Sequence, residues 1–495
     1  MTSDLAQRSI RSVTWISFVN MILLPVNFIQ SVLLARLLAV EYFGVYAGMS
    51  SIIVLTGVFF EFGLGNAYLH RSQETINEDQ AISVLFTLRL IFDTLWLLSF
   101  LIFGFLTLSG LNRLVFIVLL VAGYFNRLTI TPRLLLVRQV QHRRLAILDL
   151  IINISTTVLS LFIAFLSHSI WALLISPIIA TIFGIMGMYF IKPIWKPKLI
   201  YAESAFRYFM SFGSRNLANN IFDAAIENID NIWTSIFLGN QWLGYYSRAF
   251  KFAIYPRIIL STPISSVVLG TFAELKFDRR RLSRAFFQTT ALLIRTGFLL
   301  AGWLAVIAPQ FIRLLLGERW MPMLEAFRLM LIFSLLDPIK SSVSSVFVSV
   351  GVPEKISIIR IAQLSVMIIG LLTLGFRFQI IGVALSVDLM IVIGTVLSLI
   401  MVRSYIDVSF LKLFAAPVIS LVTGIGLAVL FNTLFYSPRS DLWTAIGGSL
   451  FFGGGYLTVL FILEGKQIYL AFREITSRSY GLKKVDDFLR HFIKS

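Results

Sequence analysis

Polar and acidic side chains recur along one face of the segment near residues 208–237. In chain order they are Asn216, Asn219, Asn220, Asp223, Glu227, Asp230, Asn231 and Thr234. At about 100° per residue these positions fall on one side of a helix, and isoleucine and alanine fill much of the remainder. A charged side chain at the centre of a bilayer costs about 2.5–3.5 kcal/mol even on the lenient insertion scale. Three carboxylates on one face must therefore meet protein, water or cations.

Two interpretations of this acidic face are open. In the first, it joins two helices, with asparagines bonding across the interface, although three acids within two turns are then hard to explain. In the second, it lines a hydrated cavity where Asp223, Glu227 and Asp230 bind a coupling ion, either H⁺ or Na⁺. We favour the cavity, because ionisable residues inside a membrane usually mark functional sites.

Basic side chains supply the opposite charge. Arg257 and Arg295 are expected near mid-depth, whereas Arg248 and Lys251 lie near the outer end of their segment. A guanidinium suits a diphosphate because its planar fork donates paired, charge-assisted hydrogen bonds. The alternatives are that Arg257 and Arg295 neutralise the acidic face, and that Arg248 snorkels to the interface.

Several other charged residues are spaced for structural roles. Arg89 with Asp93, and Asp337 with Lys340, stand three or four residues apart, so each pair is expected to form an ion pair within one helix. Asp388 is a lone polar site, for which we predict a contact inside the bundle.

Two residues near segment ends are candidates for a gate. Glu61 opens the sequence Glu61 to Gly65 (EFGLG) at the end of the second apolar segment, and its glycines allow close helix contact or a helix stop. Packing at an interface is an equally good interpretation of Glu61. Arg36, at the end of the first apolar segment, is the other gate candidate.

The composition places all these residues in a membrane protein. The chain has 495 residues, of which 58% are hydrophobic and 14% charged, whereas soluble domains hold about a quarter charged residues. No cysteine occurs, which excludes disulfides and thiolate metal sites. The formal charge is +17, but no segment outside the apolar runs combines basic and aromatic residues as a nucleic-acid-binding surface would. We therefore expect no nucleic-acid partner and assign the basic residues to cytoplasmic loops.

Apolar runs long enough to cross a bilayer recur along the chain, and they predict an all-α polytopic membrane protein with about 14 transmembrane helices. The first run is too long for a signal peptide. The spans are expected near 13–38, 43–66, 81–107, 113–137, 145–167, 170–192, 208–237, 243–270, 284–308, 323–350, 355–376, 379–402, 412–435 and 441–464.

The distribution of lysine and arginine among the loops predicts the orientation. Placing both termini in the cytoplasm gives that side the basic clusters, including Arg143, Lys196 and Arg280. The tail, 466–495, mixes apolar and basic residues, as expected of an amphipathic helix on an anionic membrane surface.

An internal repeat occurs at an offset of 200 residues. Leu38 to Tyr46 (LAVEYFGVY) aligns with Leu238 to Tyr246 (LGNQWLGYY), and each copy is the turn after the first helix of a six-span block. Two parallel six-helix halves are a transporter architecture with the substrate site between them. The sequence therefore predicts an N-terminal lobe (1–200), a C-terminal lobe (201–405), an appended helix pair (406–465) and the tail.

Several motifs resemble those of Wzx-type polysaccharide flippases, in particular the branch that exports colanic-acid-like or teichuronic-acid-like polymers. They are Ala35 to Tyr46 (ARLLAVEYFGVY), Glu61 to Gly65 (EFGLG), Leu243 to Phe250 (LGYYSRAF), Thr262 to Ser266 (TPISS) and Leu314 to Trp320 (LLLGERW). The likeness runs from about Arg8 to Arg403 and is weak beyond. These motifs identify the scaffold better than the substrate.

The resemblance implies membership of the superfamily that contains MATE drug exporters and the lipid II flippase MurJ. It implies a V-shaped, two-lobed bundle in the bacterial inner membrane, alternating access, and ion-coupled export of undecaprenyl-diphosphate-linked oligosaccharide. A polymerase and glycosyltransferases would be partners, and no cofactor beyond the coupling ion is implied. Arg257, Arg295, Arg248 and Lys251 would then hold the headgroup, and Asn216 and Asn220 would line the sugar path.

Three other functions remain open at this point. One is passive scrambling of the lipid without ion coupling, which should be indifferent to the loss of Asp223 and Glu227. A MATE-like antiporter for small cations would suit the carboxylates of the acidic face, although arginines at depth favour an anion. A membrane polymerase or glycosyltransferase would need a large loop with acid–base or metal-binding residues. The short loops make that enzyme the weaker alternative.

Overall fold

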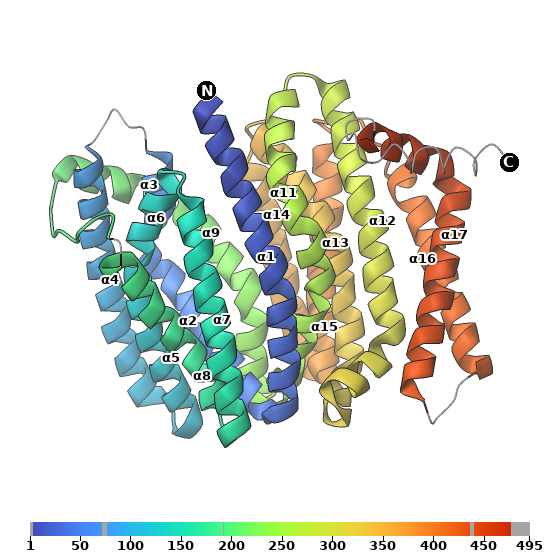
Figure 1. Ribbon diagram of the computed structural model, residues 1–495, viewed down its shortest axis with the longest axis horizontal. Coiled ribbons are helices and arrows are strands. Elements are labelled where there is room, and N and C mark those ends of the chain that lie inside the picture. Colours follow the sequence, from blue (N-terminus) through green and yellow to red (C-terminus); the bar gives the residue numbers. More distant parts are fainter. Residues whose placement is uncertain (1–2, 72–76, 192, 436–439, 477–495) are drawn as a thin grey trace. The chain divides into compact units, whose positions relative to one another are not determined.

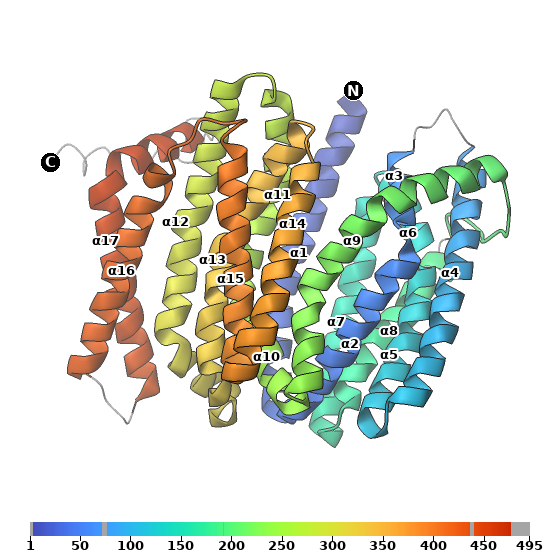
Figure 2. The ribbon, with the colours of Figure 1, turned by 180° about the vertical axis from the view of Figure 1, so that it is seen from behind.

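The computed structural model describes residues 3–71, 77–191, 193–435 and 440–476. Over these residues the regular elements are all helices, with no β-strand. Each of the fourteen expected spans coincides with one helix or with consecutive helical segments. The predicted all-α fold is therefore confirmed (Figures 1 and 2).

One compact unit comprises Met1–Arg248 and Met367–Val383. Its helices are α1 (Ser3–Leu37), α2 (Val40–Glu61), α3 (Leu64–His70), α4 (Glu78–Thr107), α5 (Gly110–Leu128), α6 (Ile130–Arg138), α7 (His142–Ser167), α8 (Trp171–Ile185), η1 (Met186–Phe190), α9 (Glu203–Phe237) and most of α10 (Asn240–Ala253). The segment η4 (Leu371–Gly375) completes it. Packing thus places α9 with the helices before it, and the division into lobes at residues 200 and 405 stays a prediction.

The second compact unit comprises Ala249–Val366 and Ala384–Ser495. It contains α11 (Tyr255–Leu275), α12 (Arg279–Phe311), η2 (Ile312–Leu316), η3 (Glu318–Met323), α13 (Leu324–Ser349), most of α14 (Glu354–Gly370) and of α15 (Phe376–Val402), α16 (Phe410–Phe435) and α17 (Asp441–Thr476). The predicted tail begins within α17, and its part beyond residue 476 lies outside the described residues.

Eleven segments of the described chain are long and apolar enough to cross a membrane. The one that runs from Glu354 to Val402 contains both α14 and α15, with a backbone break at Gln379 (φ 52°, ψ −133°). The polar helix α9 and the pair α10–α11 are not among the eleven. For these helices, spanning stays a prediction.

The two copies of the sequence repeat meet where α2 packs on α9 and α10. A Cβ atom at Gly44 would overlap the backbone carbonyl oxygen of Asn240, and one at Gly244 would overlap that of Val40. Because both pairs are related by the same offset of 200 residues, the contact is reciprocal, as at a two-fold axis. Glycine is required at both positions because any side chain would force the backbones apart.

Helices α16 and α17 share the core of the second unit. Phe452 and Tyr456 of α17 are fully buried in one hydrophobic cluster with Phe286 of α12 and Phe347 of α13. A Cβ atom at Gly302 of α12 would lie 2.6 Å from the Phe452 ring. The helices beyond residue 405 thus contribute to the core of this unit, and their description as an appended pair stays a prediction.

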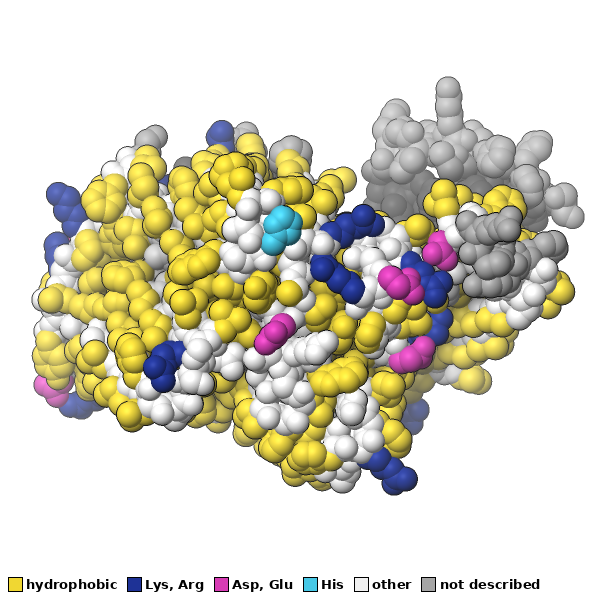
Figure 3. All heavy atoms as spheres, turned by 90° about the horizontal axis from the view of Figure 1, so that it is seen from below, with side chains coloured by type: hydrophobic (Ala, Val, Ile, Leu, Met, Phe, Trp, Pro, Cys, Tyr) yellow, Lys and Arg dark blue, Asp and Glu magenta, His cyan; other side chains and the backbone are white. Residues whose placement is uncertain are grey.

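The surface suits a lipid environment. Figure 3 looks onto the lower ends of the helices, where hydrophobic side chains are mixed with polar and charged ones. Large apolar side chains such as Leu106, Leu166 and Ile462 are at least 70% exposed. Exposing so many apolar side chains to water would be unfavourable, whereas lipid accommodates them.

Candidate functional site

The structure separates the three acids of the polar face on α9 by burial. Asp230 is buried, and its two carboxylate oxygens accept hydrogen bonds from the Tyr246 hydroxyl at 2.6 Å and the Asn231 backbone N–H at 2.7 Å. Asp223 is half-buried and Glu227 is exposed. Asp230 therefore fastens α9 to α10, whereas Asp223 and Glu227 stay nearer the surface.

The asparagines of α9 lie partly against α2. Asn216 and Asn220 are half-buried, and Asn216 donates to the Phe212 carbonyl at 3.2 Å. Gly63, between α2 and α3, and Gly213 of α9 approach closely at this level. Helix contact thus accounts for part of the polar face. Among the described residues, no three His, Asp or Glu side chains gather closely enough to hold a metal ion.

Arg257 lies in a cluster of three charges between α11 and α13. Its Nε donates to Asp337 Oδ2 at 2.8 Å, and Lys340 Nζ lies 3.2 Å from the other oxygen of the same carboxylate. The Arg257 guanidinium also stands 5.5 Å from the centre of the Phe333 ring. Two cations share one carboxylate, so the cluster carries a net charge of about +1 at neutral pH. The predicted pair of Asp337 with Lys340 is confirmed.

Arg257 is accessible to solvent, whereas its partner Asp337 is not. Its side chain is 33% exposed and that of Lys340 is 23% exposed, whereas Asp337 is 8% exposed. An anion that reached this cluster would meet guanidinium and ammonium groups before the carboxylate. This is the geometry expected of a site for an anionic group.

Arg295 of α12 is bound to Glu464 of α17. Its Nε and Nη2 donate to the two carboxylate oxygens at 2.5 and 2.7 Å. Both side chains are buried, at 13% and 7% exposed, and the Tyr456 hydroxyl donates to the Arg295 carbonyl at 2.7 Å. Each of the two arginines thus has a carboxylate partner within its own unit, Asp337 for Arg257 and Glu464 for Arg295. That they neutralise the acidic face of α9 stays a prediction.

Arg248 and Lys251, on α10, differ in their surroundings. The half-buried Arg248 guanidinium stands 4.5 Å from the centre of the Phe43 ring at the repeat contact. Lys251 is exposed. The two side chains thus differ in burial and in their surroundings.

The candidate gate residue Glu61 lies beside a buried group of charges in the first unit. Its carboxylate is 3.8 Å from Arg89, which is 3% exposed and makes no hydrogen bond among the described residues. Asp93 instead accepts a hydrogen bond at 2.7 Å from Arg127, whose guanidinium also stands over the Trp96 ring. The predicted ion pair of Arg89 with Asp93 is therefore wrong, because Arg127 of α5 takes the carboxylate.

The backbone explains where Glu61 stands. Helix α2 ends at this residue because Phe62 and Gly63 both adopt left-handed conformations, at φ 53° and 63°. The helix end leaves Glu61 partly exposed, with a 38% exposed side chain. The other gate candidate, Arg36 in the last turn of α1, is exposed.

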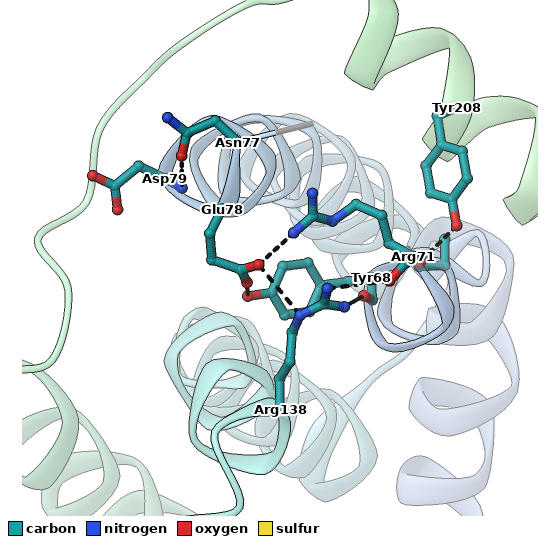
Figure 4. A network of polar contacts seen from close by, with 8 residues as sticks. Tyr68, Arg71, Asn77, Glu78, Asp79, Arg138 and Tyr208 are labelled. Atoms are coloured by element: carbon teal, nitrogen blue, oxygen red, sulfur yellow. Dashed lines mark hydrogen bonds and ion pairs between the residues drawn. The ribbon is translucent and has the colours of Figure 1, made fainter. Parts of the chain in front are cut away.

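A polar network at the α3–α4 connection was missed by the sequence analysis (Figure 4). Glu78 accepts hydrogen bonds from Tyr68 and Arg71, and Arg138 Nε lies 3.3 Å from the same carboxylate. Arg138 also donates to the Tyr68 carbonyl at 2.7 Å, and Tyr208 donates to that of Ala67 at 3.1 Å. Burial and the bond to Glu78 raise the pKa of Tyr68. The network holds α3, α4, α6 and α9 together. Of its contacts to Glu78, that of Arg71 joins residues only seven positions apart, so the sequence could have suggested that pair.

The comparisons with known proteins agree with one another. A family model described as polysaccharide biosynthesis protein matches residues 33–325, more than half of the chain. The teichuronic acid biosynthesis protein TuaB of Bacillus subtilis (strain 168) is 23% identical over 345 residues, which cover 68% of this chain and 70% of the relative. The lipopolysaccharide biosynthesis protein WzxC of Escherichia coli (strain K12) is 22% identical over 412 residues, 80% and 81% of the two chains.

Solved structures with the same fold include transporters. The lipid II flippase MurJ in an inward closed conformation superposes with a TM-score of 0.72 at 16% identity, over 92% of this chain and 99% of that one. An inward-facing MATE family multidrug transporter superposes with a TM-score of 0.58 at 14% identity, over 79% and 98%. The expected MurJ- and MATE-like fold is thus confirmed, and together with the match over residues 33–325 it establishes that this chain belongs to the polysaccharide biosynthesis protein family.

Proposed function

We propose that this protein is a flippase, which moves an oligosaccharide linked to undecaprenyl diphosphate from the cytoplasmic to the outer leaflet of the inner membrane. Membership of the polysaccharide biosynthesis protein family carries this proposal. A relative in Rhizobium meliloti (strain 1021), 24% identical over 59% of this chain, is named succinoglycan biosynthesis transport protein ExoT. The role is transport rather than bond chemistry.

The cluster of Arg257, Lys340 and Asp337 is the proposed headgroup site. A diphosphate is a compact, doubly charged anion that bidentate guanidinium contacts recognise well. The cluster has a surplus cation in an accessible position, and Asp337 holds both cations in place until the anion replaces it. Arg295 is assigned to the structure of the unit, because Glu464 already occupies its guanidinium fork.

The remaining candidates have more distant roles in this proposal. Glu227 and Asp223 bind the coupling cation, since they are the acids of α9 nearest the surface, whereas Asp230 holds Tyr246. Arg248 and Lys251 attract the anionic headgroup toward its site. Glycosyltransferases supply the lipid-linked sugar on the cytoplasmic side, where both termini lie, and a polymerase receives it outside.

Reconstituted vesicles test the proposal. Purified protein in proteoliposomes receives a labelled undecaprenyl-diphosphate oligosaccharide, and its appearance on the far leaflet is followed with and without H⁺ or Na⁺ gradients. We expect gradient-dependent flipping that Arg257→Ala and Glu227→Gln both abolish. Arg279→Gln, which removes an exposed arginine from an ion pair with Asp407, is the matched control and retains flipping.

Two outcomes would contradict the proposal. If no labelled lipid moves while a cationic dye is expelled, the protein is a MATE-like antiporter and the acids of α9 are its substrate site. If lipid flips equally well in Glu227→Gln and without any gradient, the protein is an uncoupled scramblase. Loss of flipping in Arg279→Gln as well would show that any loss of arginine disables the protein.

A further inference from the structure

Asp388 of α15 carries a buried carboxyl group. The residue is only 5% exposed, and neither Oδ1 nor Oδ2 has a hydrogen-bond partner among the described residues. The predicted role in bundle contacts is therefore wrong for this residue, because such a role requires a bonded partner. A buried carboxylate without a counter-charge is among the most expensive groups that a protein interior can hold.

Charged groups elsewhere in the second unit have partners of their own. On α15, Asp388 is the one charged residue between the backbone break at Gln379 and Val402. On α14, the Gln363 amide contacts Met390 and Gly394, and Arg360, three positions before Gln363, has interactions of its own. Among the charges within α11–α13 and α17, Arg257 and Lys340 pair with Asp337, and Arg295 pairs with Glu464.

The surroundings on the helix favour a proton over a metal cation. One turn away on the same face stand Ala384 and Ile391, both fully buried. The next hydroxyl on that face belongs to Thr395, seven positions on and roughly 10 Å along the axis, too far to share an ion with Asp388. A sodium ion would need several oxygen ligands, whereas a proton needs a single carboxylate oxygen.

We propose that Asp388 is a proton-binding site of the second unit, which holds a proton in this closed-off state and releases it when transport opens α15 to water. The inference rests on the proposed function and adds H⁺ as the ion that this residue carries. A neutral acid here still leaves a hydroxyl and a carbonyl unbonded, so leucine would be the cheaper residue for stability. The acid is thus explained by an exchange of protons rather than by packing.

The first experiment needs no substrate. Thermal unfolding of the detergent-purified protein is measured from pH 5 to pH 9 for the wild type, Asp388→Asn and Gln363→Leu. The folded wild type keeps a proton that the unfolded chain releases, so its unfolding temperature should fall relative to that of Asp388→Asn as the pH rises, by several degrees. Gln363→Leu removes a buried polar group that does not titrate, so its unfolding temperature should depend on pH as that of the wild type does. A constant difference between the wild type and Asp388→Asn across this range overturns the proposal.

The second experiment connects the proton to transport. In proteoliposomes, a pH gradient should accelerate flipping of the labelled lipid by the wild type at least fivefold. Asp388→Asn should keep the gradient-free rate and lose the acceleration. Equal acceleration of both proteins overturns the coupling role. If the wild type flips no lipid at all, the proposed function fails, and the pH dependence of unfolding still decides whether Asp388 binds a proton.

Discussion

Two arginines of the second unit, Arg257 on α11 and Arg295 on α12, look alike in the sequence. The sequence predicts both near the middle of the membrane, and the family resemblance implies that both bind the diphosphate. In the structure each has a carboxylate within 2.8 Å, yet the two sites differ in the number of cations for each carboxylate. At Arg295 one cation meets one anion through two hydrogen bonds, whereas at Arg257 two cations share one anion.

Burial separates the two sites further. Arg295 and Glu464 are 13% and 7% exposed, and the pair joins α12 to α17. Arg257 is a third exposed, next to a buried Asp337. A balanced pair with little exposure offers a ligand no net charge, whereas an unbalanced and accessible one is ready to accept an anion. Charge balance and access, rather than depth, distinguish a structural arginine from a binding one.

The largest effect is expected from breaking the balanced pair. Glu464→Leu leaves the Arg295 guanidinium buried without a counter-charge, and should destabilise the folded protein by about 3–5 kcal/mol. Thermal unfolding in detergent measures this loss. The double variant Arg295→Met with Glu464→Leu should recover most of the stability, because an apolar pair of similar volume packs where two charges had to be desolvated.

The same double variant also tests whether Arg295 is needed for transport. If Arg295 is structural, the double variant should flip lipid at a rate close to that of the wild type. A protein that is folded and stable yet inactive would return Arg295 to the substrate site, and would show that Glu464 merely holds it in this state.

The next largest effect is expected at the unbalanced site. Arg257→Gln removes charge-assisted hydrogen bonds worth about 1.5–3 kcal/mol, so flipping should slow by roughly 10- to 100-fold. Arg257→Lys keeps the charge without the fork and should fall between the wild type and Arg257→Gln. Flipping rates in proteoliposomes, with unfolding temperatures as control, measure both. An unfolding loss as large as that of Glu464→Leu would make Arg257 another structural arginine.

A smaller change of opposite sign is expected for the shared carboxylate. Asp337→Asn removes the competing anion and raises the charge of the cluster, so the headgroup should bind more tightly, by about 1 kcal/mol or roughly fivefold. Tighter binding should slow release and lower the maximal flipping rate. Titration of the flipping rate with substrate separates the two quantities. Weaker binding in Asp337→Asn would instead mean that the carboxylate positions Arg257 for the substrate.

The sequence predicts the helices well because lipid enforces them. A backbone in a bilayer must bond within its own segment, so every apolar run of sufficient length becomes a helix. The ion pair of Asp337 with Lys340 was predictable for a similar reason, since helix geometry alone brings residues three apart together. Local geometry therefore fixes the spans and brings residues at helical spacing within reach of each other.

The partners of the other charges come from distant helices, and no spacing in the sequence announces them. Asp93 had a partner at helical spacing, yet Arg127 of another helix takes it. Arg295 pairs with Glu464, 169 positions on along the chain. Asp388 has no bonded partner at all among the described residues, although its isolation in the sequence suggested an ordinary contact. Tertiary packing decides which charges are neutralised, and so which remain for function.

The smallest effect is expected at the start of α12, where an ion pair has the geometry of the Arg295 pair without its burial. Arg279 donates to Asp407 from Nε at 3.0 Å and from Nη2 at 2.7 Å, and both side chains are exposed. These hydrogen bonds lower the pKa of Asp407, so the pair stabilises the fold above the ordinary carboxyl pKa of about 3.9 and loses this contribution as the pH falls through the lowered value. Asp407→Asn should shift the unfolding temperature by about 1 °C or less at pH 7, because solvent screens exposed pairs. This difference should begin to shrink at about pH 4 and vanish once the pH is below the lowered pKa. A shift at pH 7 as large as that of Glu464→Leu would mean that geometry, and not burial, sets the strength of these pairs.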